Sequence, residues 1–167
     1  MKSTLKLEIE NFYRNNRDGL FRYAVSLIQD SNEAEDLVHT GMQVLVEFVR
    51  ENQCLPDHLR CFVVTCIRNA AVDTLRKRQV SETMIVDISH IMQKDMMAIE
   101  HENLARLFSL LTENEKEVIL LRDILGYSFR EISRIHKRSM FTVASWHRRG
   151  ICKLRLFLLE EAQNENM

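Results

Sequence analysis

The chain has 167 residues, and its content of 46% hydrophobic and 28% charged residues supports a folded core of one domain or two small ones and argues against disorder. Four glycines and one proline are too few for a turn-rich β-sandwich or barrel, and no apolar run approaches the ~18–20 residues of a membrane span. The formal net charge is −1, and Glu8 and Glu10 stand where a secretory signal would be apolar, so we expect a cytoplasmic protein with no membrane insertion.

Helical periodicity begins in the N-terminal half of the chain. We expect one or two helices over Phe12–Gln29 and another over Ser31–Glu51, which opens at a capping box formed by Asp30 and Glu33. Apolar residues of the second helix recur at three- and four-residue spacing. Its opposite face is polar and includes Asp36, His39, Thr40 and Gln43.

A long helix is predicted after the break at Pro56, over Asp57–Arg78. We expect its buried face to consist of Leu59, Phe62, Val63, Cys66, Ala70 and Leu75. At 100° per residue, a second face carries Thr65, Arg68, Asn69, Val72 and Arg76. The helix closes with the basic sequence Arg76-Lys77-Arg78.

Residues 80–103 break the helical pattern. They combine methionines and isoleucines with acidic residues, which predicts a linker apolar enough to lie against a domain or a partner. The alternative is that the second half of this segment begins the next helix.

The C-terminal third contains two capping boxes, Thr112 with Glu115 and Ser128 with Glu131. The first predicts a helix ending near Gly126, and the second a short helix reaching His136. A tight turn at residues 137–138 and an N-cap at Ser139 then lead into a last helix over Met140–Glu161. A short helix, a turn and a longer basic helix form the pattern of a helix-turn-helix.

The last helix has two distinct faces. The side expected to pack inward comprises Val143, Gly150, Ile151, Leu154, Phe157 and Leu158. Ser145, Arg148, Arg149, Cys152 and Arg155 point outward, with Thr142 and Lys153 on the flank. Hydroxyls and guanidinium groups arranged in this way meet phosphate oxygens or base edges of DNA. Trp146 lies at the edge of the inward arc, which fits either packing or a DNA contact, and His136 and His147 occupy core-pattern positions.

Charge is separated along the chain. Residues 1–79 hold 11 basic and 11 acidic residues, residues 80–129 hold 4 and 9, and residues 130–155 hold 8 and 1, a net charge of +7. Together with Arg76–Arg78, this distribution predicts two contacts with a polyanion. The alternative is that both clusters are solvated helix faces.

The four cysteines show no Cys-x-x-Cys motif and no pairing with histidine at zinc-finger spacing. We expect Cys61 and Cys66 to be packed thiols and expect no metal site or cofactor. The chain also lacks a nucleophile–base pair and a phosphate-binding glycine loop, which argues against an enzyme.

Four stretches of the chain, two in each half, resemble the extracytoplasmic-function group of bacterial sigma factors. In the first half these are AEDLV at residues 34–38 and IRNAAVDTLRKR at residues 67–78. In the second half they are LTENEKEVILLRDILGYSFREIS at residues 111–133 and TVAS at residues 142–145. The resemblance implies an all-α protein with sigma domain 2 at residues 1–79, a linker at residues 80–103 and sigma domain 4 at residues 104–167.

The same resemblance implies a function and a set of partners. Domain 2 would bind core RNA polymerase through Asp36, His39, Thr40 and Gln43. It would meet the -10 promoter element through Thr65, Arg68, Asn69, Arg76 and Lys77. Domain 4 would bind the -35 element through Ser139, Thr142, Ser145, Arg148 and Arg149. The resemblance also implies an anti-sigma factor as a partner.

Some positions depart from the family pattern. His39 and Met42 replace its usual glutamine and aromatic residue, and Lys137 occupies a turn position that is commonly glycine, which predicts local backbone strain. Ala144 and Trp146 stand where basic residues are usual. Two other functions therefore remain open: a helix-turn-helix regulator that does not join polymerase, and a sigma-like interaction protein that has lost DNA recognition.

Overall fold

The computed structural model describes residues 3–78, 106 and 109–164, and in these ranges every regular element is a helix, which confirms the all-α prediction. The chain divides into two compact units, Met1–Ile85 and Val86–Met167. The linker predicted at residues 80–103 lies outside the described residues.

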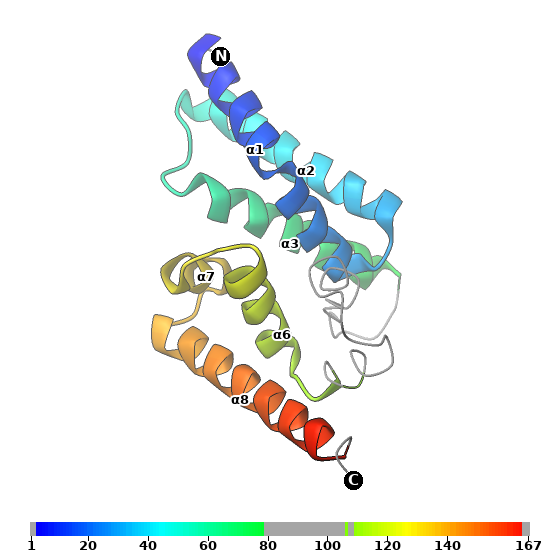
Figure 1. Ribbon diagram of the computed structural model, residues 1–167. Coiled ribbons are helices and arrows are strands. Elements are labelled where there is room, and N and C mark those ends of the chain that lie inside the picture. The colour runs from blue at the N-terminus through cyan, green and yellow to red at the C-terminus, as the bar shows by residue number, and fades with distance from the viewer. Residues whose placement is uncertain (1–2, 79–105, 107–108, 165–167) are drawn as a thin grey trace. The chain divides into compact units, whose positions relative to one another are not determined.

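The described part of the first unit contains three helices, α1 (Ser3–Ile28), α2 (Ser31–Asn52) and α3 (Leu59–Lys77), each packed against the other two (Figure 1). The first helix is a single element and starts earlier than expected. Fully buried side chains from all three, among them Tyr23, Leu45 and Ile67, form the core. The unit is therefore built around one hydrophobic core to which all three helices contribute.

The junction between α1 and α2 is very short. Gln29 takes a left-handed conformation with φ 58°, and the Asp30 side chain accepts a hydrogen bond of 2.9 Å from the backbone N–H of Glu33. This confirms Asp30 as the N-cap, but the carboxylate of Glu33 pairs with Arg78 at the end of α3. The predicted capping box is thus only half formed, because a long-range ion pair takes its second member.

The buried face of α3 differs from the prediction. The buried residues are Cys61, Val63, Val64, Ile67 and Ala71, so only Val63 of the predicted six belongs to this face. Apolar residues occupy almost every position from 61 to 67, and such a run does not define a helical phase. Packing against α1 and α2 determines which side of α3 is buried.

The two cysteines of α3 are packed as expected. Cys61 is buried and Cys66 half-buried, and burial raises the pKa of the Cys66 thiol. All four cysteines are free, with Cys54 and Cys152 exposed.

Gly41 allows α2 and α3 to approach closely. A Cβ atom at this position would lie 2.7 Å from Cγ1 of Ile67 and 3.5 Å from the carbonyl oxygen of Val63. Because Ile67 is fully buried, its branched side chain has little space into which it can move. The absence of a side chain at residue 41 therefore sets the spacing between the two helices.

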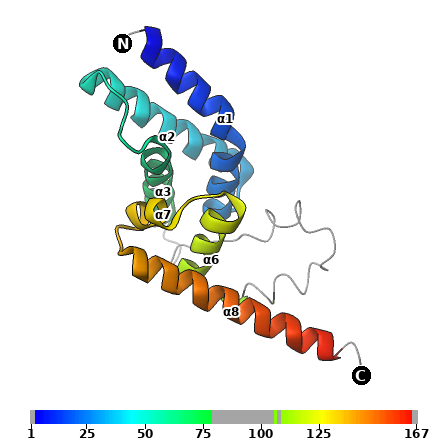
Figure 2. The same cartoon turned by 60° about the vertical axis from the view of Figure 1, so that its left-hand side comes forward.

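From residue 113 onward, the described part of the second unit contains α6 (Glu113–Ile119), the π-helix η1 (Leu120–Ile124), α7 (Phe129–His136) and α8 (Met140–Asn164) (Figure 2). Both predicted capping boxes are confirmed, at Thr112 and at Ser128. The segment after α6 ends as predicted near Gly126, which has φ 71°, but its last turn is π-helical, with a 3.0 Å hydrogen bond from Leu125 N–H to the carbonyl of Leu120.

The inward face of α8 is confirmed in part. Val143, Gly150 and Phe157 are buried, whereas Leu158, which was predicted to pack inward, is exposed. The helix has 25 residues and packs against α6 and α7. No described helix has the length and apolar character needed to cross a membrane.

We predict that Gly41→Val destabilises the protein by about 1–3 kcal/mol, the usual cost of overpacking a core. A side chain in place of glycine would gain up to about 1 kcal/mol of helix propensity, but the contact with Ile67 outweighs that gain. Urea denaturation measures the change. Glu47→Val, at an exposed position of the same helix, controls for the β-branched residue and should change stability little. Equal stability of the two variants would contradict the close-approach argument.

Candidate functional site

The turn between α7 and α8 fixes the direction of the last helix. Lys137 adopts a left-handed conformation with φ 52°, as expected for a position where glycine is usual, and its N–H bonds back to the carbonyl of Arg134 at 3.3 Å. Ser139 then caps α8 by accepting the N–H of Thr142 at 3.1 Å. Its hydroxyl also lies 2.9 Å from that of Thr142. The helix-turn-helix predicted from the sequence is formed.

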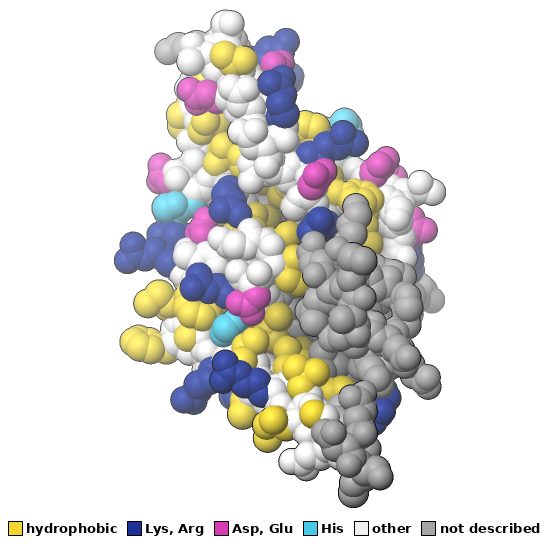
Figure 3. Space-filling model, in the orientation of Figure 1, with side chains coloured by type: hydrophobic (Ala, Val, Ile, Leu, Met, Phe, Trp, Pro, Cys, Tyr) yellow, Lys and Arg dark blue, Asp and Glu magenta, His cyan; other side chains and the backbone are white. Residues whose placement is uncertain are grey.

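The predicted DNA-contacting residues of α8 lie on one side of the helix. Arg148 and Arg149 are exposed, Thr142 and Ser145 are half-buried, and Ser139 is exposed at the start. Figure 3 shows Lys and Arg side chains gathered with protruding apolar groups over α7 and the first turns of α8. This side, from Ser139 to Arg149, is called the α8 outer face below.

A buried carboxylate joins α6 to this helix. Glu115, 2% exposed, accepts a 2.9 Å hydrogen bond from the N–H of Thr112 and a 2.7 Å hydrogen bond from Nζ of Lys153, and its other oxygen lies 3.6 Å from Nε of Arg149. Arg149 therefore has an internal partner although its side chain is 56% exposed. Arg148 and Arg149 were both predicted to contact DNA, but Arg149 already pairs with a buried carboxylate of its own unit.

The environment of Glu115 shifts its titration. Burial alone would raise the pKa of this carboxyl group, but the hydrogen bonds and charge of Lys153 and the hydrogen bonds from Thr112 outweigh burial, and its pKa is lowered. A carboxylate with a depressed pKa stabilises the fold at pH values above its unfolded pKa, and that contribution is lost as the pH falls through the folded pKa.

We predict that Glu115→Gln lowers the melting temperature of the full chain by several degrees at pH 7, because the buried ion pair with Lys153 is lost. The difference from the natural chain should shrink below about pH 4, where the unfolded carboxyl group is itself protonated. Thermal melts between pH 7 and pH 3 measure the effect. Glu113→Gln, two residues earlier and more exposed, is the control; a constant difference for Glu115→Gln at all pH values would contradict this account.

The two histidines of the helix-turn-helix each lie beside a different carboxylate. Nε2 of His136 is 3.6 Å from Glu117, and both side chains are almost fully buried. Nε2 of His147 is 2.8 Å from Asp123, in the π-helical turn. The ring of Trp146 meets that of His136 edge to face at 5.6 Å. Trp146 therefore packs within the unit, which favours a packing role over a DNA contact.

The predicted DNA-contacting residues of α3 are only partly exposed. Thr65 and Arg68 are half-buried, and the Thr65 hydroxyl donates to the carbonyl of Cys61 at 2.7 Å. Asn69, Arg76 and Lys77 are exposed. Because Thr65, Asn69 and Arg76 recur at helical spacing they share a stripe, whereas Lys77 lies about 100° around the helix from Arg76.

The predicted polymerase-binding residues form a single exposed stripe of α2. Asp36, His39, Thr40 and Gln43 are all exposed, and Nε2 of Gln43 lies 3.1 Å from Nε2 of His39. This stripe is called the α2 outer face below.

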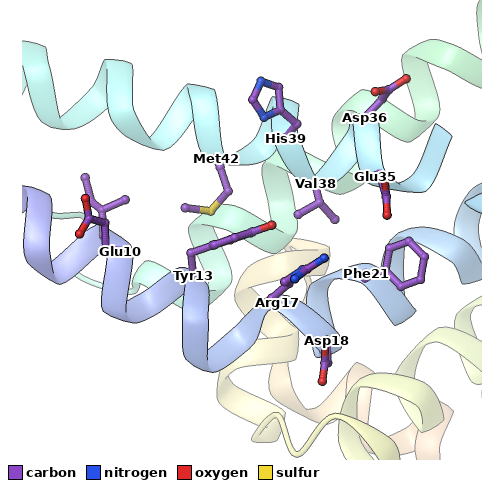
Figure 4. A pocket seen from close by; sticks show the side chains of 11 residues that line it. Glu10, Tyr13, Arg17, Asp18, Phe21, Glu35, Asp36, Val38, His39 and Met42 are labelled. Carbon is purple, nitrogen blue, oxygen red and sulfur yellow. The ribbon is translucent and has the colours of Figure 1, made fainter. Parts of the chain in front are cut away.

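A groove that the sequence did not reveal runs beside this stripe. It has a volume of about 760 Å³ and is lined by α1 and α2. Figure 4 shows Tyr13 and Arg17 pointing from α1 towards Val38 and Met42 of α2. Four acidic residues also line it: Glu10, Asp18, Glu35 and Asp36. Finding the groove requires knowing that α1 pairs with α2, which no local pattern indicates. In the described ranges, no cluster of His, Cys, Asp and Glu is arranged to hold a metal ion.

Comparison with known proteins identifies the class. Residues 12–80 match the family described as Sigma-70 region 2, and residues 101–154 match Sigma-70, region 4. The two matches together span well over half of the chain and contain the α2 outer face, α3 and the α8 outer face. The chain belongs to the sigma-70 family of RNA polymerase sigma factors, a family of transcription regulators, and it acts in transcription initiation.

Individual relatives point to the extracytoplasmic-function group. The chain is 24% identical over 169 aligned positions to the ECF RNA polymerase sigma factor SigX of Bacillus subtilis (strain 168), covering 93% of this chain and 84% of that protein. Its fold is similar to that of the sigma factor RpoE from Bartonella quintana, solved in complex with the anti-sigma factor NepR. That similarity has a TM-score of 0.61 at 20% identity and covers 90% of this chain and 96% of that one. The resemblance to ECF sigma factors found in the sequence is confirmed.

Proposed function

We propose that the first unit binds core RNA polymerase through the α2 outer face and the -10 element through α3, while the second unit binds the -35 element through the α8 outer face. The domain limits expected at residues 1–79 and 104–167 would then separate two DNA contacts on one subunit. The observation that carries the proposal is the exposure of Arg148 on the outer face of a well-capped helix, in a region of net charge +7.

Each arginine of the α8 outer face has its own role in this proposal. Arg148 is exposed and follows the N-cap Ser139 by about two and a half turns, in reach of a phosphate or a guanine edge. Arg149 is held by Glu115, which restrains its guanidinium group and shares its charge with a buried carboxylate. Arg148 is therefore the main electrostatic contact, and Arg149 is a pre-positioned second one.

The α2 outer face supports the polymerase contact on different grounds. It is polar and exposed, and the neighbouring groove adds apolar surface with an acidic lining. An apolar groove with polar groups around it suits a protein partner better than DNA, which the acidic residues would repel. The same surface is a candidate for an anti-sigma factor, which would then compete with polymerase. A protein that binds RNA polymerase works where the DNA is, which supports a cytoplasmic location.

We predict that Arg148→Glu lowers promoter affinity at least tenfold in the complex with core polymerase and reduces the dependence of log affinity on log salt by about one unit. Arg14→Glu, an equal charge change at an exposed position of α1, is the matched control. Fluorescence anisotropy on labelled promoter duplex at several salt concentrations measures both quantities. The assignment of the α8 outer face is wrong if the two variants bind alike.

We predict that Asp36→Lys weakens binding to core polymerase about tenfold without changing the melting temperature, because Asp36 is exposed. Glu8→Lys on α1 gives the same charge change and should leave the affinity unchanged. Surface plasmon resonance with immobilised core polymerase tests the pair. Normal affinity of the Asp36 variant would remove the α2 outer face from the polymerase contact.

Reconstituted transcription separates this proposal from the two alternatives. Promoter-dependent initiation with core polymerase is the expected result. DNA binding without polymerase binding would indicate a separate helix-turn-helix regulator, and polymerase binding without initiation would indicate an interaction protein that has lost DNA recognition.

A further inference from the structure

Phe141 is a solvent-exposed aromatic side chain at the start of α8, the second helix of the helix-turn-helix and therefore its recognition helix. It is 84% exposed, more than any other large hydrophobic side chain in the described ranges, and Met140 before it is 48% exposed. Removing such a ring from water is favourable, so an exposed phenylalanine at this position has a strong tendency to pack against a partner surface.

Helical geometry places this ring on the α8 outer face. Phe141 precedes Ser145 by four residues and Arg148 by seven, so the three side chains form one stripe. In a helix-turn-helix, the N-terminal residues of the second helix contact the base edges in the major groove. Phe141 is the second residue of α8 and belongs to that end.

The hydroxyl groups near Phe141 take part in the N-terminal cap of α8. The Ser139 hydroxyl accepts the N–H of Thr142 at 3.1 Å and lies 2.9 Å from the Thr142 hydroxyl. These groups hold the start of the helix, which reduces what they can offer to a base. Trp146 packs on His136 inside the unit. The aromatic group presented outward at this end is thus Phe141.

We propose that Phe141 is a specificity residue that packs its ring against the C5-methyl group of a thymine in the -35 element. The thymine methyl is the apolar group that the major groove displays, and phenylalanine is one of the side chains that contact it. The inference rests on the proposed function of the α8 outer face and adds to it an apolar base contact beside the arginine contacts.

The test uses the full chain bound to core polymerase. A duplex library with a randomised -35 region is selected for binding, and each thymine of the selected duplex is then replaced singly by uracil, which lacks only the methyl group. We expect one replacement to weaken binding about fourfold, the effect of one buried methyl group. Phe141→Ala should bind the thymine and uracil duplexes equally. Arg148→Ala should weaken both duplexes by the same factor and keep the discrimination.

The outcomes separate the inference from the proposal beneath it. Phe141→Ala that still discriminates thymine from uracil, or a natural chain indifferent to every replacement, would overturn the inference. The same holds if Phe141→Ala weakens polymerase binding and leaves discrimination intact, since the ring would then cover a protein. If Arg148→Ala also binds like the natural chain, the α8 outer face does not bind DNA and the proposed function itself fails. A thermal melt of Phe141→Ala is expected to match the natural chain because the ring is exposed.

Discussion

The buried carboxylate of Glu115 is the interaction on which the second unit depends. Through one side chain it closes the capping box of α6 at Thr112 and receives Lys153 from the middle of α8. A buried charge is costly unless hydrogen bonds and an opposite charge compensate it, and here both do. Glu115 thereby connects the beginning of α6 to α8. The orientation of the α8 outer face follows from this connection together with the packing of Gly150 against Ile119.

The accuracy of sequence-based prediction follows the range of the interactions involved. Helix starts at Thr112, Ser128 and Ser139 are signalled within three or four residues, and all three are found where expected. The buried face of α3 was wrong because a run of apolar residues has no phase of its own. The link between Glu115 and Lys153 spans 38 residues, and no local pattern announces it.

Site residues follow the same rule. The amphipathic pattern of α2 predicts its outer face, and that face is exposed in the structure. The adjoining groove depends on residues of two helices and was not predicted. The sequence places the arginines at positions 148 and 149 together on the outward side of the helix, and only the tertiary structure shows that Glu115 holds Arg149. The π-helical turn, which carries Asp123 towards His147, has no recognisable sequence signal.

The close packing at Gly41 has a mechanical consequence. With Ile67 seated against the bare backbone, α2 cannot slide along α3 without disturbing the core. A force applied to the outer side of one helix is therefore transmitted to the other. A protein bound to the outer side of α2 and a nucleic acid bound to α3 would therefore be held in a fixed arrangement relative to each other, because the two helices between them move as one rigid pair.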